Sequence, residues 1–208
     1  LSMALFEKSH RNSLCHPLIT GPMAIAAGLW LLPVSFADYQ DRVALLTWLL
    51  GPATVALAIP LYHQLPNIRA HGTAIVLTTL LGGFAAVAIA LAGAALMGAD
   101  DVVLLSLASK SITTPIALSI SELIGGIGQL AAGAVIITGV TGALAAPPLL
   151  RSIGITDSRV IGFTLGLTAH GIGTARAFDI DMQAGAYASL GMGLTGLLTA
   201  LILPLLLI

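Results

Sequence analysis

The sequence carries little charge. Only 8% of its 208 residues are Asp, Glu, Lys or Arg, whereas a soluble domain carries roughly 25%. Hydrophobic residues make up 57% of the chain, and the mean hydropathy is +1.02. Such a surface could not stay hydrated, which excludes an ordinary soluble protein and indicates that lipid surrounds the chain.

Several features of enzymes and nucleic-acid-binding proteins are also missing. The single cysteine, Cys15, excludes an internal disulfide, and the net charge of -1 excludes a basic nucleic-acid-binding surface. The five histidines lack metal-ligand spacing, and the sequence contains no nucleophile elbow, Walker motif or dinucleotide fingerprint. We therefore expect no enzymatic activity, no metal or other cofactor and no nucleic-acid partner.

What the sequence does contain is long apolar runs. Roughly 20 apolar residues cross the hydrocarbon core of a bilayer as a helix. The runs that qualify are Leu18–Phe36, Val43–Tyr62, Gly72–Ala99, Leu123–Leu150 and Met182–Ile208. The predicted fold is all-α, a multi-pass transmembrane helical protein of the cell (inner) membrane.

Loop charges predict an unusual path for residues 102–121. The positive-inside rule places residues 7–16 in the cytoplasm and, after two crossings, Arg69 as well. If 102–121 crossed fully, Arg151 and Arg159 would lie outside; if it turned back, they would lie inside, as the rule prefers. Two arms of about 10 residues reach roughly the midplane, so a re-entrant hairpin fits both length and charge.

A charge and four hydroxyls interrupt this segment at Ser109-Lys110-Ser111-Ile112-Thr113-Thr114-Pro115. The residues Thr113-Thr114-Pro115 are typical of a helix start, with a hydroxyl N-cap followed by Pro at the first helical position. A helix that begins in mid-membrane presents free N–H groups and a positive dipole end to an anion. Lys110 would add a full charge there; alternatively it extends to an interface while the hydroxyls bond backbone.

A second polar interruption runs from Gly166 to Arg176. Gly171 and Gly173 allow backbone angles that break a helix, and Thr174 could cap the helix that restarts. His170 suits proton coupling or carboxylate binding, and the guanidinium of Arg176 can grip a carboxylate. The alternative is a hydrogen-bonded core histidine and an arginine that anchors the chain at the interface.

Glu122 ends the first polar element. It could pair with a cation, take up a transported proton or face water at the membrane surface, and the sequence leaves these roles open. Glu122 and His170 are the candidates for proton coupling.

The two polar elements resemble copies of one unit. A shift of 60 residues aligns Lys110 with His170 and Thr114 with Thr174, and a shift of 57 aligns Gly139 with Gly196. One hairpin plus one crossing would invert the second copy, as in many secondary transporters. The expected organisation is an N-terminal cytoplasmic segment or helix tail (1–16), a three-helix scaffold (17–100) and a transport core (101–208) of two units (102–150 and 160–208).

Three stretches together resemble the LrgB/CidB family of bacterial membrane proteins, to which plastid glycolate/glycerate translocators belong. They are Leu50–Tyr62, Lys110–Glu122 with Ile124–Gly126, and His170–Ala177 followed by Gly185-Ala186 and Met192–Leu194. Ser109, Ala169 and Thr195 stand where the family usually has Pro, Ser and Asn, which affects substrate contacts rather than membership. The family usually has a further N-terminal hydrophobic segment, so we expect Leu1 not to be the natural start.

The resemblance implies either of two functions, an antiholin-like regulator of murein hydrolase export and autolysis or a carrier of small carboxylates. Charged groups beside helix breaks favour a secondary carrier of glycolate- or glycerate-like 2-hydroxy monocarboxylates, driven by alternating access, with saturable counterflow separating it from a channel. The expected partners are the substrate, the bilayer, a second copy in a homodimer with elevator-like motion, and a small LrgA/CidA-type membrane protein. The expected substrate-binding residues are Lys110, Ser111, Thr113, Thr114, His170, Gly171, Gly173, Thr174 and Arg176.

Overall fold

The computed structural model describes residues 2, 6, 17–56 and 58–207, and all regular structure within them is helical. The predicted N-terminal segment, residues 1–16, lies outside the described residues apart from Ser2 and Phe6. The chain forms two compact units, residues 1–58 and 59–208. The predicted all-α membrane fold is confirmed at this level, while the division into scaffold and transport core stays a prediction.

The first unit contains α2 (Pro17–Leu31), α3 (Phe36–Arg42) and α4 (Ala44–Ala56). The first two apolar runs thus form shorter helices than the sequence predicted. Pro33 disfavours helical angles at the residue before it, which accounts for the end of α2. Pro60 has no N–H for the carbonyl of Ala56, where α4 ends.

Three helices of the second unit are long and apolar enough to cross a membrane. They are α7 (Gly72–Leu96), α10 (Gly128–Ser152) and α12 (Met182–Leu207), and their bounds lie within five residues of the predicted runs. Two short helices, α5 (Ala58–His63) and α6 (Leu65–Ala70), precede them. Leu81 and Phe84 of α7 are 69% and 73% exposed, so lipid is the solvent that suits this face.

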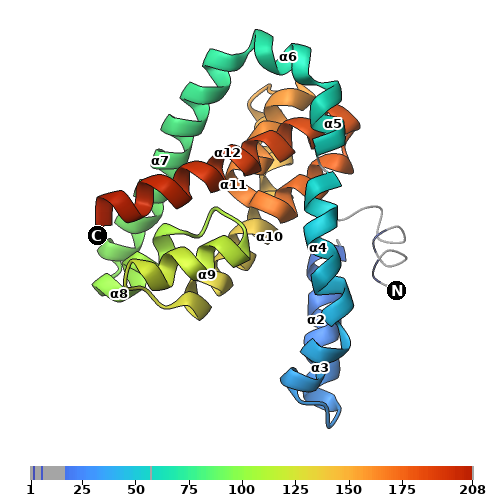
Figure 1. The fold of residues 1–208 in the computed structure, drawn as a ribbon, viewed down its shortest axis with the longest axis vertical. Coiled ribbons are helices and arrows are strands. Elements are labelled where there is room, and N and C mark those ends of the chain that lie inside the picture. Colours follow the sequence, from blue (N-terminus) through green and yellow to red (C-terminus); the bar gives the residue numbers. More distant parts are fainter. Residues whose placement is uncertain (1, 3–5, 7–16, 57, 208) are drawn as a thin grey trace. The chain divides into compact units, whose positions relative to one another are not determined.

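Residues 101–127 form a helical hairpin, called the first hairpin here (Figure 1). Its arms are α8 (Asp101–Ala108) and α9 (Thr114–Leu123), joined by Ser109–Thr113. The amide of Ile127 donates to Oγ of Ser106 at 2.7 Å, although the two residues would lie about 30 Å apart along a straight helix. Of the two predicted alternatives, the chain therefore turns back.

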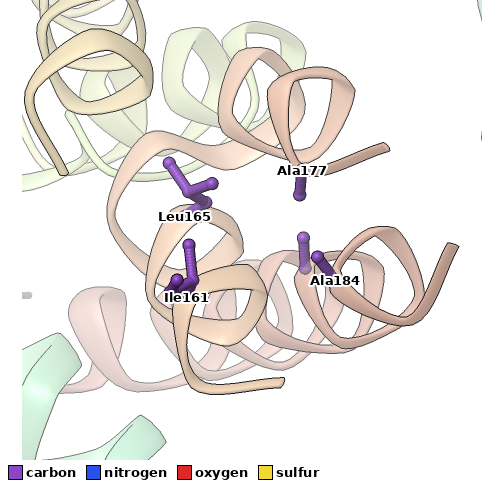
Figure 2. Close-up of a cluster of buried hydrophobic side chains, with 5 residues drawn as sticks. Ile161, Leu165, Ala177 and Ala184 are labelled. Carbon is purple, nitrogen blue, oxygen red and sulfur yellow. The ribbon is translucent and has the colours of Figure 1, made fainter. Parts of the chain in front are cut away.

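Residues 158–178 form the second hairpin, α11 (Ser158–Phe178), because the helix breaks at Ala169 and His170. Figure 2 shows Ile161 and Leu165 on one arm facing Ala177 on the other, with Ala184 of α12 beside them. The pattern Gly162-Xaa3-Gly166 lies against the backbone of Ala184 and Ala188. Small residues at this spacing let two helices touch backbone to backbone, and this contact fixes the second hairpin to α12.

The hairpins enter the second unit from opposite ends. Tyr187 near the start of α12 packs with Ile75 near the start of α7, while Leu203 and Leu91 near their ends pack with the first hairpin. The two helices therefore run parallel. By contrast, Leu150 at the end of α10 packs against the second hairpin, so α10 runs antiparallel to α12.

Candidate functional site

The tips of the two hairpins meet beside Val135, about 10 Å along α10 from its first residue. Ile112 of the first tip packs with Val135 and Ala117. His170 of the second tip lies 2.9 Å through Nε2 from the carbonyl oxygen of Val135. Since a carbonyl only accepts, Nε2 carries the proton and donates. The predicted polar elements thus share one place in the fold.

The first tip holds the predicted cation. Lys110 is half-buried, and its Nζ donates to Oγ of the buried Ser111 at 3.0 Å. The helix α9 starts at Thr114, with Thr113 as the N-cap residue and Pro115 in its first turn. The predicted start is correct to within one residue, because the N-cap is Thr113 rather than Thr114.

Hydrogen-bond donors at the start of α9 remain available. In the described chain, the Thr113 side chain makes no capping hydrogen bond to this helix. Pro115 has no N–H, so the amides of Thr114 and Ile116 are the donors that point along the helix axis toward the tip. Together with Lys110, they form a positively polarised end suited to an anion.

The second tip breaks the helix just before the predicted glycines. Ala169 and His170 leave helical geometry, and His170 has φ 42° and ψ -131°. Gly173 instead permits close contact with the carbonyl of Leu165 on the opposite arm. The prediction that Gly171 and Gly173 form the break was wrong, because Gly173 is needed for packing and Gly171 follows the break.

Thr174 does not cap the restarted helix as predicted. Its hydroxyl donates to the carbonyl of His170, four residues earlier, at 2.8 Å, as helical threonines often do. The same hydroxyl lies 3.7 Å from Sδ of Met192. Thr174 is therefore a hydrogen-bonded residue within the restarted helix rather than its cap.

The described contacts do not bring Arg176 to the tips. It lies six residues beyond His170, about 9 Å toward the base of the hairpin, and Nη1 is 3.6 Å from Asp179. Its buried Nε has no hydrogen-bond partner among the described residues. Glu122 is exposed at the base of the first hairpin, so it also lies away from the tips.

Sequence reasoning missed the surface that receives the tips. A Cβ on Gly139 of α10 would lie 2.6 Å from Cε1 of His170 and 2.8 Å from Cδ1 of Ile172. A Cβ on Gly196 of α12 would lie 3.6 Å from Cδ1 of Ile116 in the first hairpin. The signals that pointed to such contacts were the repeat alignment of these two glycines and the small residues around Gly196, which are typical of a helix-packing face.

Within the described residues, no group of His, Cys, Asp and Glu could hold a metal ion. The groups at the tips offer hydrogen bonds and charge. A cation and two backbone donors at the first tip are groups that suit a small anion.

Comparison with known proteins gives one family. The model of the LrgB-like family matches residues 1–208. An uncharacterised Bacillus subtilis (strain 168) protein, YwbG, is 35% identical over 92% of this chain and 85% of its own length. Holin-like protein CidB of Staphylococcus epidermidis (strain ATCC 35984) is 28% identical over 97% of this chain and 88% of its own length. The CidB of Staphylococcus aureus (strain Mu50) is 27% identical with the same coverage, and no solved structure matches the chain.

Proposed function

The chain belongs to the LrgB-like family, and from this premise we propose that it is a secondary carrier of small 2-hydroxy monocarboxylates such as glycolate or glycerate. One observation carries the proposal: two helical hairpins enter from opposite ends, and their polar tips meet at Val135. Broken helices that meet in mid-membrane are the usual build of binding sites in secondary transporters.

The carboxylate site is the start of α9. Lys110 and the amides of Thr114 and Ile116 would hold the carboxylate, with Ser111 and Thr113 bonding the substrate hydroxyl. Because Nε2 of His170 donates to Val135, its Nδ1 is an acceptor. In this proposal Nδ1 accepts a hydrogen bond from the substrate hydroxyl. Arg176 contributes less in this proposal, because Asp179 already pairs with it.

Inverted repeats would account for the paired contacts of the long helices. Gly139 follows the first hairpin and receives the second, while Gly196 follows the second hairpin and receives the first. Helices α10 and α12 run in opposite directions, as such a repeat requires. We propose that the two hairpins move together, in elevator fashion, within a homodimer in the inner membrane, with Glu122 or His170 as the proton-coupling group.

The rival function is an antiholin-like regulator of murein hydrolase export and autolysis with no substrate of its own. The CidB relatives are named holin-like proteins, which favours this alternative. A small LrgA/CidA-type membrane partner belongs to this alternative. Such a role needs helices that associate but gives no use for a cation beside two helix breaks.

Uptake of labelled glycolate by proteoliposomes separates the two. The carrier should show saturable uptake and counterflow, and Lys110→Ala should abolish most of it. Arg69→Ala, which removes an exposed charge of α6, is the matched control and should transport normally. Absence of uptake by the unaltered protein, or full uptake by Lys110→Ala, would overturn the carrier proposal.

A further inference from the structure

A cavity of about 200 Å³ lies away from the hairpin tips, where α7, α11 and α12 come together near their starts. Its apolar lining includes Ile75, Val160 and Phe163. His71, the ion pair of Asp157 and Arg159, and Tyr187 add polar groups. The carrier proposal uses none of these residues.

Tyr187 is the residue that points to a ligand. It is only 3% exposed, and its hydroxyl has no hydrogen-bond partner among the described residues. Leaving a buried hydroxyl unpaired costs about 1–3 kcal/mol. An acceptor on a molecule bound in the cavity would remove this cost.

The ion pair gives the mouth of the cavity both signs of charge. Nη2 of Arg159 lies 2.6 Å from Oδ2 of Asp157, and Nε also donates to this carboxylate. Hydrogen bonds from Arg159 lower the pKa of Asp157 to about 2, so the carboxylate stays ionised at neutral pH. The pair is therefore neutral overall, and a ligand with one positive and one negative group complements it better than a simple anion.

Polarity changes with depth along the cavity. Asp157 and Arg159 lie at the start of α11, whereas Phe163 and Tyr187 lie five residues into α11 and α12, about 7 Å deeper. The headgroup layer of a bilayer is roughly 5–7 Å thick on each side. The charged pair therefore lies at the helix ends and apolar side chains continue deeper into the membrane, as the headgroup and acyl chains of a phospholipid do.

We propose that this cavity binds a zwitterionic phospholipid with an ethanolamine headgroup. The phosphate accepts hydrogen bonds from Nη1 and Nη2 of Arg159, and the ammonium group faces Asp157. The hydroxyl of Tyr187 donates to an ester carbonyl, and the start of an acyl chain covers Ile75, Val160 and Phe163. The proposal rests on membrane embedding alone and holds whether or not the protein carries glycolate.

Native mass spectrometry of the detergent-purified full chain tests the site, with phosphatidylethanolamine and phosphatidylglycerol offered separately. The unaltered protein should retain more phosphatidylethanolamine. Tyr187→Phe should lower this retention roughly 2- to 10-fold, the factor that corresponds to one hydrogen bond. Tyr62→Phe removes an exposed tyrosine hydroxyl of α5 and should retain lipid normally.

Asp157→Asn tests the charge argument. Asn also serves well as an N-cap residue, so α11 keeps its start. The unpaired Arg159 should then reverse the preference in favour of phosphatidylglycerol. Equal or stronger binding of phosphatidylglycerol by the unaltered protein, unchanged retention by Tyr187→Phe, or displacement of the lipid by millimolar glycolate would each overturn the proposal.

Discussion

The tips of the first and second hairpins reach the same place on α10, but their polar groups differ in how many hydrogen bonds they already make within the protein. The first turns through five residues, and Lys110 and the start of α9 keep donors available. The second breaks at two residues, and its polar groups are bonded inside the protein: His170 to Val135, Thr174 to His170. The difference favours the first hairpin as the source of the groups in the proposed anion site, because the hydrogen bonds of the second hold its tip in one conformation.

The largest expected effect comes from freeing the second hairpin from α12. Gly166→Ala places a methyl group against the carbonyl of Ala188, and backbone cannot yield as a side chain can. We expect a loss of more than about 3 kcal/mol in the free energy of unfolding. Chemical unfolding in detergent measures it.

Gly133→Ala is the control for this substitution. Gly133 lies in α10 with open space around it, and Ala there should be neutral or stabilise the helix by up to about 1 kcal/mol. Equal stability of Gly166→Ala and the unaltered protein would show that the second hairpin is not fixed by this contact.

The second largest expected effect is on transport, where substitutions in the two hairpins should differ. Lys110→Ala should lower glycolate uptake at least about 30-fold, the scale of losing one partner of a desolvated charge pair. Arg176→Ala should lower it at most about fivefold, because Arg176 is partly exposed and already paired with Asp179. Initial rates in proteoliposomes measure both, and a larger loss with Arg176→Ala would reverse the assignment of roles.

The sequence predicted one hairpin better than the other, for a physical reason. A lysine and a Thr-Thr-Pro start within an apolar run are local signals, and they located the first break to within a residue. At the second break the local signals were glycines. A glycine allows a helix to break, but it also allows two helices to pack closely, so it does not locate the break. Gly173 was needed against Leu165, so the break fell on Ala169 and His170. Which helix receives each tip depends on tertiary contacts that no local pattern contains.

The angles of His170 allow a smaller test of the second break. Both His170→Ala and His170→Gly lose the bond to Val135, so their difference isolates the backbone. Only glycine readily adopts φ 42° with ψ -131°. We expect His170→Gly to be more stable than His170→Ala by about 1 kcal/mol, measured by unfolding in detergent. A less stable glycine variant would contradict strain at this residue.

The smallest expected effect lies at the base of the second hairpin, where Asp157 caps α11 and pairs with Arg159. Its pKa is lowered from 3.8 to about 2 by hydrogen bonds from Arg159. A carboxyl group whose pKa is depressed in the folded state stabilises it above the unfolded pKa, and this stability is lost as the pH falls from about 4 to about 2. Solvent screens the exposed pair, so the melting temperature should fall only slightly over this range. Asp157→Asn should remove that part of the pH dependence. It should leave glycolate uptake at neutral pH unchanged, since Asp157 lies far along α11 from the tips. A loss of uptake would instead place the base of this hairpin in the transport path.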